Sequence, residues 1–459
     1  MSATAHSRPE WSASVREFAS NPVLLWSAFV LTHLWLGMLN LYAPGMPLGD
    51  VSVVYKFWTD QAIVAHYWVG IDSSWVYPIV ALVPMLLARA FGPELYSSTW
   101  LSLVMVLNAV AFASVIGWGR QRQNVSVGWW WVAFLLLLGP IALGRIDSIT
   151  VPLAIVGVLQ VAQRPAAAAV ILTIATWIKV WPAAILAAIV ISVKSRLRVV
   201  VVSAATSLVI VLVALALGSG ANVFSFVGQQ TARGLQVEAP ISTIWLWEGW
   251  AHVPNTFVYY DQALLTWQVR GPGVSTASGL MTPLLALVLV AIVIVAILSV
   301  RRGASALDVL PALSLAFVAA CIAVNKVGSP QYMTWLAVPV ILGLSTRLAG
   351  HGRSFRTPAI LSLVLAALTQ AFYPYLYGYL LGLNTFMLLV LSARNLLVFV
   401  VLGWSLVAVW RASSARGDDA LSRDAGEWEP GGSVSGIWPF STSKRPDDRD
   451  RLDAGTLPT

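Results

Sequence analysis

Residues 281–300 read MTPLLALVLVAIVIVAILSV, an apolar run that contains no charged side chain. A helix needs about 20 such residues to cross the hydrocarbon core of a bilayer. The whole chain has the same character, because 58% of its 459 residues are hydrophobic and only 10% are charged. Soluble domains carry about 25% charged residues, so this composition predicts a membrane protein with many helices.

Similar runs recur along the chain and predict an all-α, polytopic transmembrane protein with about 12 spans. The first run, 23–42, is too long for the core of a signal peptide and is predicted to be an uncleaved signal anchor. Runs 166–178 and 182–193 are short, which indicates tilted, broken or re-entrant helices. The expected spans are 23–42, 97–118, 125–144, 148–163, 166–178, 182–193, 199–217, 281–300, 306–324, 332–346, 358–377 and 391–410.

Lysines and arginines set the expected orientation, because cytoplasmic loops of membrane proteins are enriched in both. With the N-terminus in the cytoplasm, most basic loop residues fall on that side of the plasma membrane and both termini are cytoplasmic. The net charge of +8 is then a property of these loops and requires no nucleic acid. The loop residues are Arg120, Arg122, Arg164, Lys194, Arg196, Arg198, Arg301, Arg302, Arg347, Arg353, Arg356 and Arg411.

The run YPIVALVPMLLARAFG, residues 77–92, would invert every later loop if it crossed the membrane. We therefore expect 50–66 and 77–92 to be helices that lie along the outer face or dip into it. Asp60 is then solvated, and Asp72 caps its loop. One side of 50–66 is expected to carry Val51, Val54, Trp58, Ala62 and Ala65, and the other Ser52, Lys56, Thr59 and Asp60.

The chain divides into a cytoplasmic N-terminal tail (1–22), a membrane domain (23–411) and a C-terminal tail (412–459). The last is charged, contains Gly and Pro, and has no apolar period, which predicts disorder in the cytoplasm. Cys321 is the only cysteine, which excludes an internal disulfide and a thiolate metal site. The histidines are scattered and predict no metal site; His33 is expected to be packed. The sequence contains no visible repeat, which disfavours the inverted repeats of many transporters.

The remaining charges fall on the expected outer side. Each alone could be a solvated loop charge or a snorkelling side chain. Ionisable groups near the hydrocarbon boundary usually face a polar cavity or a partner, so the set predicts a shared pocket. Its members are Asp50, Lys56, Asp60, Asp72, Arg145, Asp147, Lys179, Arg233, Glu238, Glu248, Asp261, Arg270, Lys326 and Arg394.

Two short motifs place charges at helix ends. GRIDS (144–148) joins two spans, and Asp147 or Ser148 could cap the helix that follows. TWIKVWP (176–182) places Lys179 between two short helices, where a lysine could cap the C-terminus of the first. The alternative for both motifs is a place in the outer pocket.

Two further motifs belong to outer loops. RGLQVEAP (233–240) contains a possible ion pair between Arg233 and Glu238. NKVGSPQYMTW (325–335) is the densest polar cluster between two spans, which indicates ligand binding. Arg394, in SARNLL, lies just inside the last span and needs an anionic partner or a route to water. The polar residues of 325–335 are Asn325, Lys326, Ser329, Gln331 and Tyr332.

These motifs in this order, together with MPLGDVSVVYKFW (46–58) and its Gly-Asp, resemble the GT-C superfamily of membrane glycosyltransferases over about residues 20–411. They resemble glycosyltransferase family 87 in particular, which includes polyprenol-phosphate-mannose-dependent α-mannosyltransferases of actinobacterial envelope synthesis. The resemblance implies a GT-C-type fold and transfer of a sugar, mannose first, from a polyprenyl-phosphate donor. The acceptor is an envelope glycolipid or glycan on the extracytoplasmic face, and the anomeric centre is inverted.

The resemblance also implies roles for residues of this chain. Asp50 matches the outer acid that acts as base on the acceptor hydroxyl. The departing phosphate needs cations, for which the candidates are Lys179, Arg233, Lys326 and Arg394. Gln331 and Tyr332 could donate hydrogen bonds to the donor. The secondary candidates are Arg145, Asp147 and Glu238. This chemistry requires no cofactor and no metal, and the expected partners are the donor, the acceptor and membrane lipids.

Several alternatives remain open at this stage. The donor sugar could be mannose, arabinofuranose or another, and the acceptor a glycolipid, a polysaccharide or a protein. The 22 tryptophans fit an interfacial belt, although a few could stack on sugar rings. A lipid or sugar transporter or flippase is the main alternative, but it should place polar groups near the bilayer midplane rather than at one face. A catalytically silent scaffold is the third.

Overall fold

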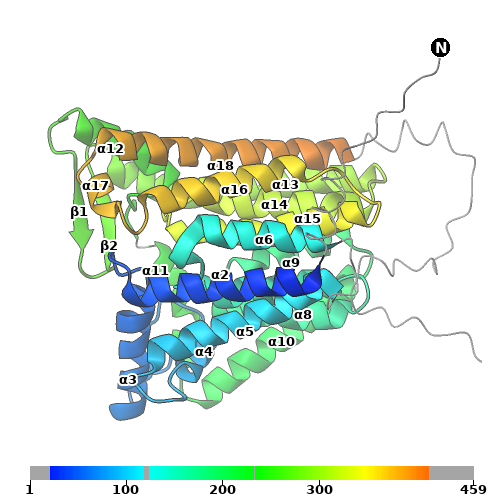
Figure 1. Ribbon diagram of the computed structural model, residues 1–459, viewed down its shortest axis with the longest axis horizontal. Coiled ribbons are helices and arrows are strands. Elements are labelled where there is room, and N and C mark those ends of the chain that lie inside the picture. Colours follow the sequence, from blue (N-terminus) through cyan, green and yellow to red (C-terminus); the bar gives the residue numbers. More distant parts are fainter. Residues whose placement is uncertain (1–20, 118–123, 232, 413–459) are drawn as a thin grey trace, which may run out of the picture.

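The computed structural model describes residues 21–117, 124–231 and 233–412, so Arg120, Arg122 and most of both predicted tails lie outside the described residues. The chain forms a bundle of helices with one small hairpin (Figure 1). Each expected span coincides with a helix. These helices are α2 (Pro22–Tyr42), α5 (Tyr96–Ile116), α6 (Val125–Leu138), α7 (Asp147–Gln160), α8 (Pro165–Ile178), α9 (Pro182–Ser192), α10 (Arg196–Ala216), α13 (Val274–Arg301), α14 (Ala306–Ala323), α15 (Ala337–Leu348), α16 (Arg356–Phe372) and α18 (Thr385–Ala412).

Seven helices of the described chain are long and apolar enough to cross a membrane: α2, α5, α6 with its extension to Ala142, α10, α13, α14 and α18. This confirms a helical, polytopic membrane protein. Helices α7, α8, α9 and α16 are apolar but shorter. The 11 residues of α9 span only about 16 Å, well below the thickness of a hydrocarbon core. The prediction that 166–178 and 182–193 form short helices is therefore confirmed.

The described chain begins and ends at the same end of the bundle (Figure 1). The opposite end, which we call the hairpin end, carries β1 (Phe257–Asp261) and β2 (Thr266–Arg270). These strands pair antiparallel, with Phe257 opposite Arg270. Most of the short elements also lie at this end. They are the π-helix η1 (Asp50–Tyr55), α3 (Lys56–Val64), η6 (Gly220–Phe224), α11 (Ser225–Thr231), η7 (Pro240–Ser242), α12 (Thr243–Trp250) and α17 (Tyr377–Leu381).

The two segments expected to lie along the surface form short helices. Figure 1 shows α3 lying across the direction of the long helices. Residues 77–92 contain only η2 (Ile79–Ala81) and the six-residue α4 (Leu82–Leu87), so this run is no spanning helix, as predicted. Irregular chain before Ile79 and turns after Leu87 bound this helical part.

The face assignment within 50–66 was partly wrong. Thr59, predicted on the polar side, is fully buried, whereas Ala65 is exposed. Val53 and Phe57 point away from the bundle with more than half of their surface exposed. A helix between the bundle and lipid presents apolar side chains on both faces, which the simple division into two sides did not allow for. Asp60 was predicted to be a solvated charge, but its carboxylate pairs with Lys56 at 2.8 Å and with Arg89 at 3.0 Å.

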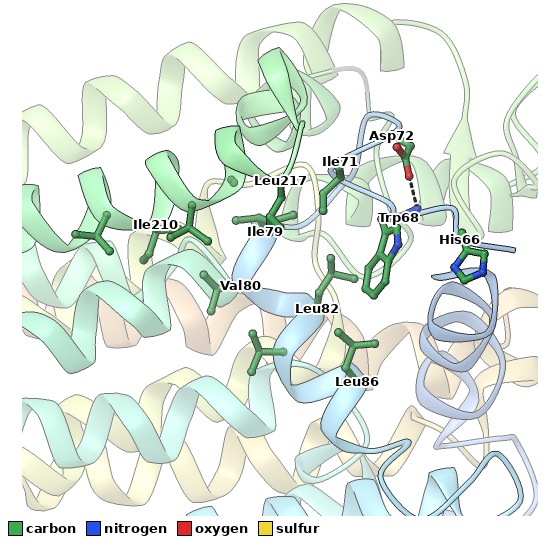
Figure 2. Close-up of a pocket in the computed structure, with 14 residues that line it drawn as sticks. His66, Trp68, Ile71, Asp72, Ile79, Val80, Leu82, Leu86, Ile210 and Leu217 are labelled. Carbon is green, nitrogen blue, oxygen red and sulfur yellow. Dashed lines mark hydrogen bonds between the residues drawn. The ribbon is translucent and has the colours of Figure 1, made fainter. Parts of the chain in front are cut away.

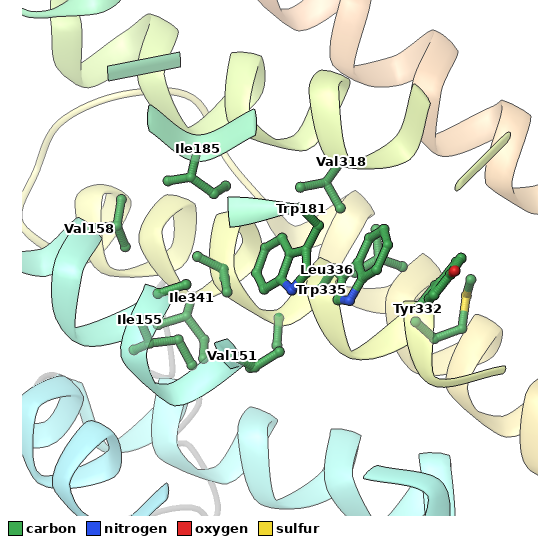
Figure 3. Close-up of a cluster of buried hydrophobic side chains, with 14 of the residues drawn as sticks. Val151, Ile155, Val158, Trp181, Ile185, Val318, Tyr332, Trp335, Leu336 and Ile341 are labelled. Carbon is green, nitrogen blue, oxygen red and sulfur yellow. The ribbon is translucent and has the colours of Figure 1, made fainter. Parts of the chain in front are cut away.

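An aromatic stack lies in the core where α7, α9 and η8 (Pro330–Leu336) meet (Figure 3). The rings of Trp181 and Trp335 stack at 5.3 Å, and Tyr332 stacks on Trp335 at 4.2 Å. The Trp181 indole N–H donates to Thr150 Oγ1 at 2.9 Å. The stack fixes the short helices near the hairpin end. Elsewhere His33 is packed as predicted, with its ring nitrogens near Phe29 O and Asn108 Nδ2.

Candidate functional site

Asp50 is the first residue of η1, where the chain turns after α2 at the hairpin end. A π-helical turn is rare and often marks a functional position. The Asp50 carboxylate pairs through Oδ2 with Arg145 Nε at 3.1 Å, and its side chain is 41% exposed against 8% for Arg145. A solvent-accessible carboxylate is therefore held by a buried cation.

Arg145 is itself fixed by neutral acceptors. Its Nη1 group donates to Pro47 O and Gly144 O, both at 2.7 Å, and Nη2 donates to Tyr373 Oη at 2.7 Å. Gly144 is needed for this approach, since a side chain there would meet Asn40 and the Pro47 carbonyl. The GRIDS turn thus presents one arginine to Asp50 in a defined orientation.

Asp147 and Ser148 do not cap α7, so the helix cap considered for the GRIDS motif does not form. The fully buried Asp147 carboxylate accepts hydrogen bonds from Lys179 Nζ at 2.7 Å and Trp335 Nε1 at 2.6 Å. Ser148 instead donates to the Arg145 carbonyl. Lys179 does end α8, but its side chain crosses to Asp147. Burial lowers the pKa of Lys179, but the charge of Asp147, the neighbouring Tyr332 and Tyr77 and the hydrogen bond to Asp147 together raise it above its ordinary value.

Two tyrosines connect these ion pairs into one cluster. Burial raises the pKa of Tyr77, while Lys179 lowers it and both Asp50 and Asp147 raise it. The Lys179 ammonium is 5.9 Å from the Tyr77 ring centre, so Tyr77 lies beside the pair of Asp147 and Lys179. Burial likewise raises the pKa of Tyr373, on which Arg145, Asp50 and Glu238 also act. Four of the predicted outer charges, Asp50, Arg145, Asp147 and Lys179, thus form two ion pairs, whereas Lys56 and Asp60 pair with each other.

The possible ion pair between Arg233 and Glu238 does not form among the described residues. Glu238 Oε1 accepts a hydrogen bond from Tyr377 Oη at 2.6 Å, and burial raises the pKa of this carboxyl. Arg394 lies behind this loop with no exposed surface. It donates to Glu238 O at 2.9 Å and to Gly328 O at 3.1 Å. These contacts favour a role in holding two loops together rather than direct contact with a ligand.

The loops 233–240 and 325–335 and the hairpin form one unit. Gln236 N donates to Lys326 O at 3.0 Å, and Gln236 Oε1 accepts from Gly328 N at 3.1 Å. Val269 N of β2 donates to Leu235 O at 3.0 Å. This unit positions Arg233 and Lys326. Of the other predicted donor-binding residues, Tyr332 lies beside Lys179, 5.2 Å from ring centre to Nζ, and Gln331 is buried in η8.

Gly328 allows the two loops to approach each other closely, because a methyl group there would overlap the backbone of Ala239. We expect Gly328→Ala to separate the two loops and to lower the thermal unfolding temperature in detergent by several degrees. Gly403→Ala is the matched control, since nothing lies within 4 Å of its added methyl and alanine favours the α18 helix. Equal unfolding temperatures for the two variants would contradict this interpretation.

An apolar groove lies between segment 66–86 and α10 (Figure 2). It has a volume of about 610 Å³ and is lined by side chains from segment 66–86, among them Ile79 and Leu82, by α10, including Ile210, and by Leu217 just after α10. At its polar end Asp72 Oδ2 accepts a hydrogen bond from Trp68 N at 2.7 Å, which confirms the predicted loop cap. The lining would suit a hydrocarbon chain rather than a polar ligand.

Sequence reasoning missed the tyrosines of the site, Tyr55, Tyr373 and Tyr377. The aromatic run FYPYLYGY (372–379) was the available signal, because it lies at the outer end of the predicted span 358–377. Tyr55 Oη lies 3.4 Å from Tyr77 Oη and accepts a hydrogen bond from Ile146 N. Within the described residues, no group of three or more His, Cys, Asp or Glu side chains could hold a metal ion.

Comparisons of the chain with protein-family models, with curated proteins and with solved structures found no match.

Proposed function

We propose that the protein is a membrane glycosyltransferase that moves a sugar from a polyprenyl-phosphate donor to an acceptor hydroxyl, with inversion. The observation that carries the proposal is the placement of Asp50. Its Oδ2 is held by Arg145, while its side chain remains partly open to solvent at the end of the bundle where the other charges gather. This arrangement suits a general base that must receive a substrate hydroxyl.

The proposed step is a direct displacement. The acceptor O–H proton passes to Asp50, the acceptor oxygen bonds to the anomeric carbon, and the bond from that carbon to the phosphate oxygen breaks. The electron pair of that bond leaves with the polyprenyl phosphate. Asp147 does not suit the base role, because it is fully buried and both of its oxygens already accept hydrogen bonds.

The arrangement of basic residues supports an extracytoplasmic site. Arg301, Arg302 and Arg347 end helices at the side where the described chain begins and ends, as cytoplasmic arginines would. The hairpin end then faces outward and carries the reaction. The same arrangement fits a GT-C-type enzyme of glycosyltransferase family 87, with mannose as the first sugar to test. The apolar groove of Figure 2 would accommodate the chain of a lipid-linked substrate.

A transporter or flippase remains the competing function, since the same groove would also suit a lipid in transit. The charged cluster favours an enzyme, because it lies at one end of the bundle and not midway along the helices.

Purified full-length protein should transfer radiolabelled sugar from at least one polyprenyl-phosphate donor to a glycolipid fraction. We would test mannosyl and arabinofuranosyl donors in turn. NMR of the product should show the anomeric configuration opposite to that of the donor. Lipid scrambling by the protein in vesicles, without transfer from any such donor, would contradict the enzyme assignment and favour the flippase.

A further inference from the structure

A second cavity, of about 580 Å³, opens at the hairpin end beside loop 233–235. Its walls come from that loop, β2, the first turns of α13 and the loop after α14. Three of the lining residues are cations, namely Arg233, Arg270 and Lys326, and none is an aspartate or glutamate. We call this the basic cavity.

The candidate cations differ in where they lie. Lys179, which pairs with Asp147, and Arg145, which pairs with Asp50, do not line the basic cavity. Arg394 has no exposed surface and donates to backbone carbonyls. Of the four cations that the sequence proposed for phosphate binding, only Arg233 and Lys326 line a cavity of this kind. The structure adds Arg270, which the sequence did not single out for this role.

The positive charges of Arg233 and Lys326 in the basic cavity repel each other. Burial lowers the pKa of Lys326, and the charge of Arg233 lowers it further. A bound anion would offset both effects, because it attracts the two cations and replaces their lost hydration. Asp261, which accepts a hydrogen bond from the Gln268 amide at 3.3 Å, does not line the cavity.

Neutral donors complete the walls. Ser275 and Ser278 line the cavity from α13, and Ser278 Oγ donates to Arg233 O at 3.1 Å, which fixes the loop that carries Arg233. The Arg270 guanidinium lies 5.9 Å from the Phe257 ring centre, which holds its stem against β1. Guanidinium groups and hydroxyls are the donors that bind phosphate oxygens in proteins.

We propose that the basic cavity is a phosphate-binding site in which Arg270 acts with Arg233 and Lys326. The phosphate belongs either to a lipid or to a free anion. Its identification with the phosphate of the lipid-linked donor rests on the proposed function. The inference that the cavity binds a phosphate does not depend on that function.

The test measures binding to the purified full-length protein in detergent, with polyprenyl phosphate, phosphatidylglycerol and inorganic phosphate as separate ligands. Arg270→Gln and Arg233→Gln should each weaken binding of the preferred ligand about tenfold. Arg270→Lys should retain most of the affinity, and added salt should weaken binding by the wild type. Arg302→Gln is the matched control, because Arg302 also lies over an aromatic ring, at 4.2 Å from Trp410.

The three ligands identify the source of the phosphate. Selective binding of polyprenyl phosphate supports the donor, equal binding of phosphatidylglycerol supports a general lipid headgroup, and binding of inorganic phosphate alone supports a free anion. The proposal is wrong if both glutamine variants fold and bind all three ligands as the wild type does, or if Arg302→Gln causes the same loss. Binding without sugar transfer would contradict the proposed function alone. Transfer with unchanged binding in the variants would contradict only this site.

Discussion

Asp50→Asn should lower sugar transfer about 10³-fold, within the range by which general bases accelerate reactions. The amide cannot accept the acceptor proton as the new bond forms. The fold should survive, because Arg145 keeps its hydrogen bonds to Pro47 O, Gly144 O and Tyr373. The measurement is the rate of transfer from radiolabelled donor in proteoliposomes, together with the unfolding temperature of each variant.

Glu248→Gln is the matched control for this variant. It removes one carboxylate from the hairpin end, in α12, without touching the Asp50 cluster, so the transfer rate should stay within about twofold of the wild type. Polyprenyl-phosphate binding should be unchanged in both variants, since Asp50 does not line the basic cavity. Transfer by folded Asp50→Asn at the wild-type rate would remove Asp50 from the reaction.

Hydropathy and charge patterns predicted the helices well, because a lipid environment places strict demands on length and polarity. All the expected spans coincide with helices, and 77–92 is no span. The basic loops also indicated which charges would gather at one end. This was possible because the chain has few charges, so each charge outside the predicted cytoplasmic loops could be considered by itself.

The sequence could not predict which charged side chains pair with each other, because the pairing depends on how distant segments pack. Asp147 and Lys179 are 32 residues apart, and Trp335 comes from a third segment. A turn motif alone suggested a helix cap for Asp147, and only the packing of α7, α8 and η8 shows the buried pair. The same reason explains why the predicted ion pair between Arg233 and Glu238 was wrong. Their closeness in sequence indicated a contact, but Tyr377 and Arg394 approach Glu238 from other helices.

The buried pair of Asp147 and Lys179 leads to the second large effect. Lys179→Met should destabilise the folded protein by about 3–5 kcal/mol, because it leaves the Asp147 carboxylate buried with only the Trp335 indole as donor. Asp147→Asn should be similarly destabilising, since it leaves the ammonium of Lys179 without its counter-charge. Denaturant titration in mixed micelles measures both changes in the free energy of unfolding.

The double variant Asp147→Asn/Lys179→Met decides whether the pair acts through stability or through catalysis. Removing both charges at once should recover most of the lost stability, so the two single effects should be strongly non-additive. If the refolded double variant also transfers sugar near the wild-type rate, Lys179 holds the short helices together and is not a phosphate ligand. If it folds but transfers sugar at a much lower rate, the pair of Asp147 and Lys179 contributes to the reaction as well as to stability. Additive losses in the double variant would contradict the pairing itself, because two independent residues would then account for the data.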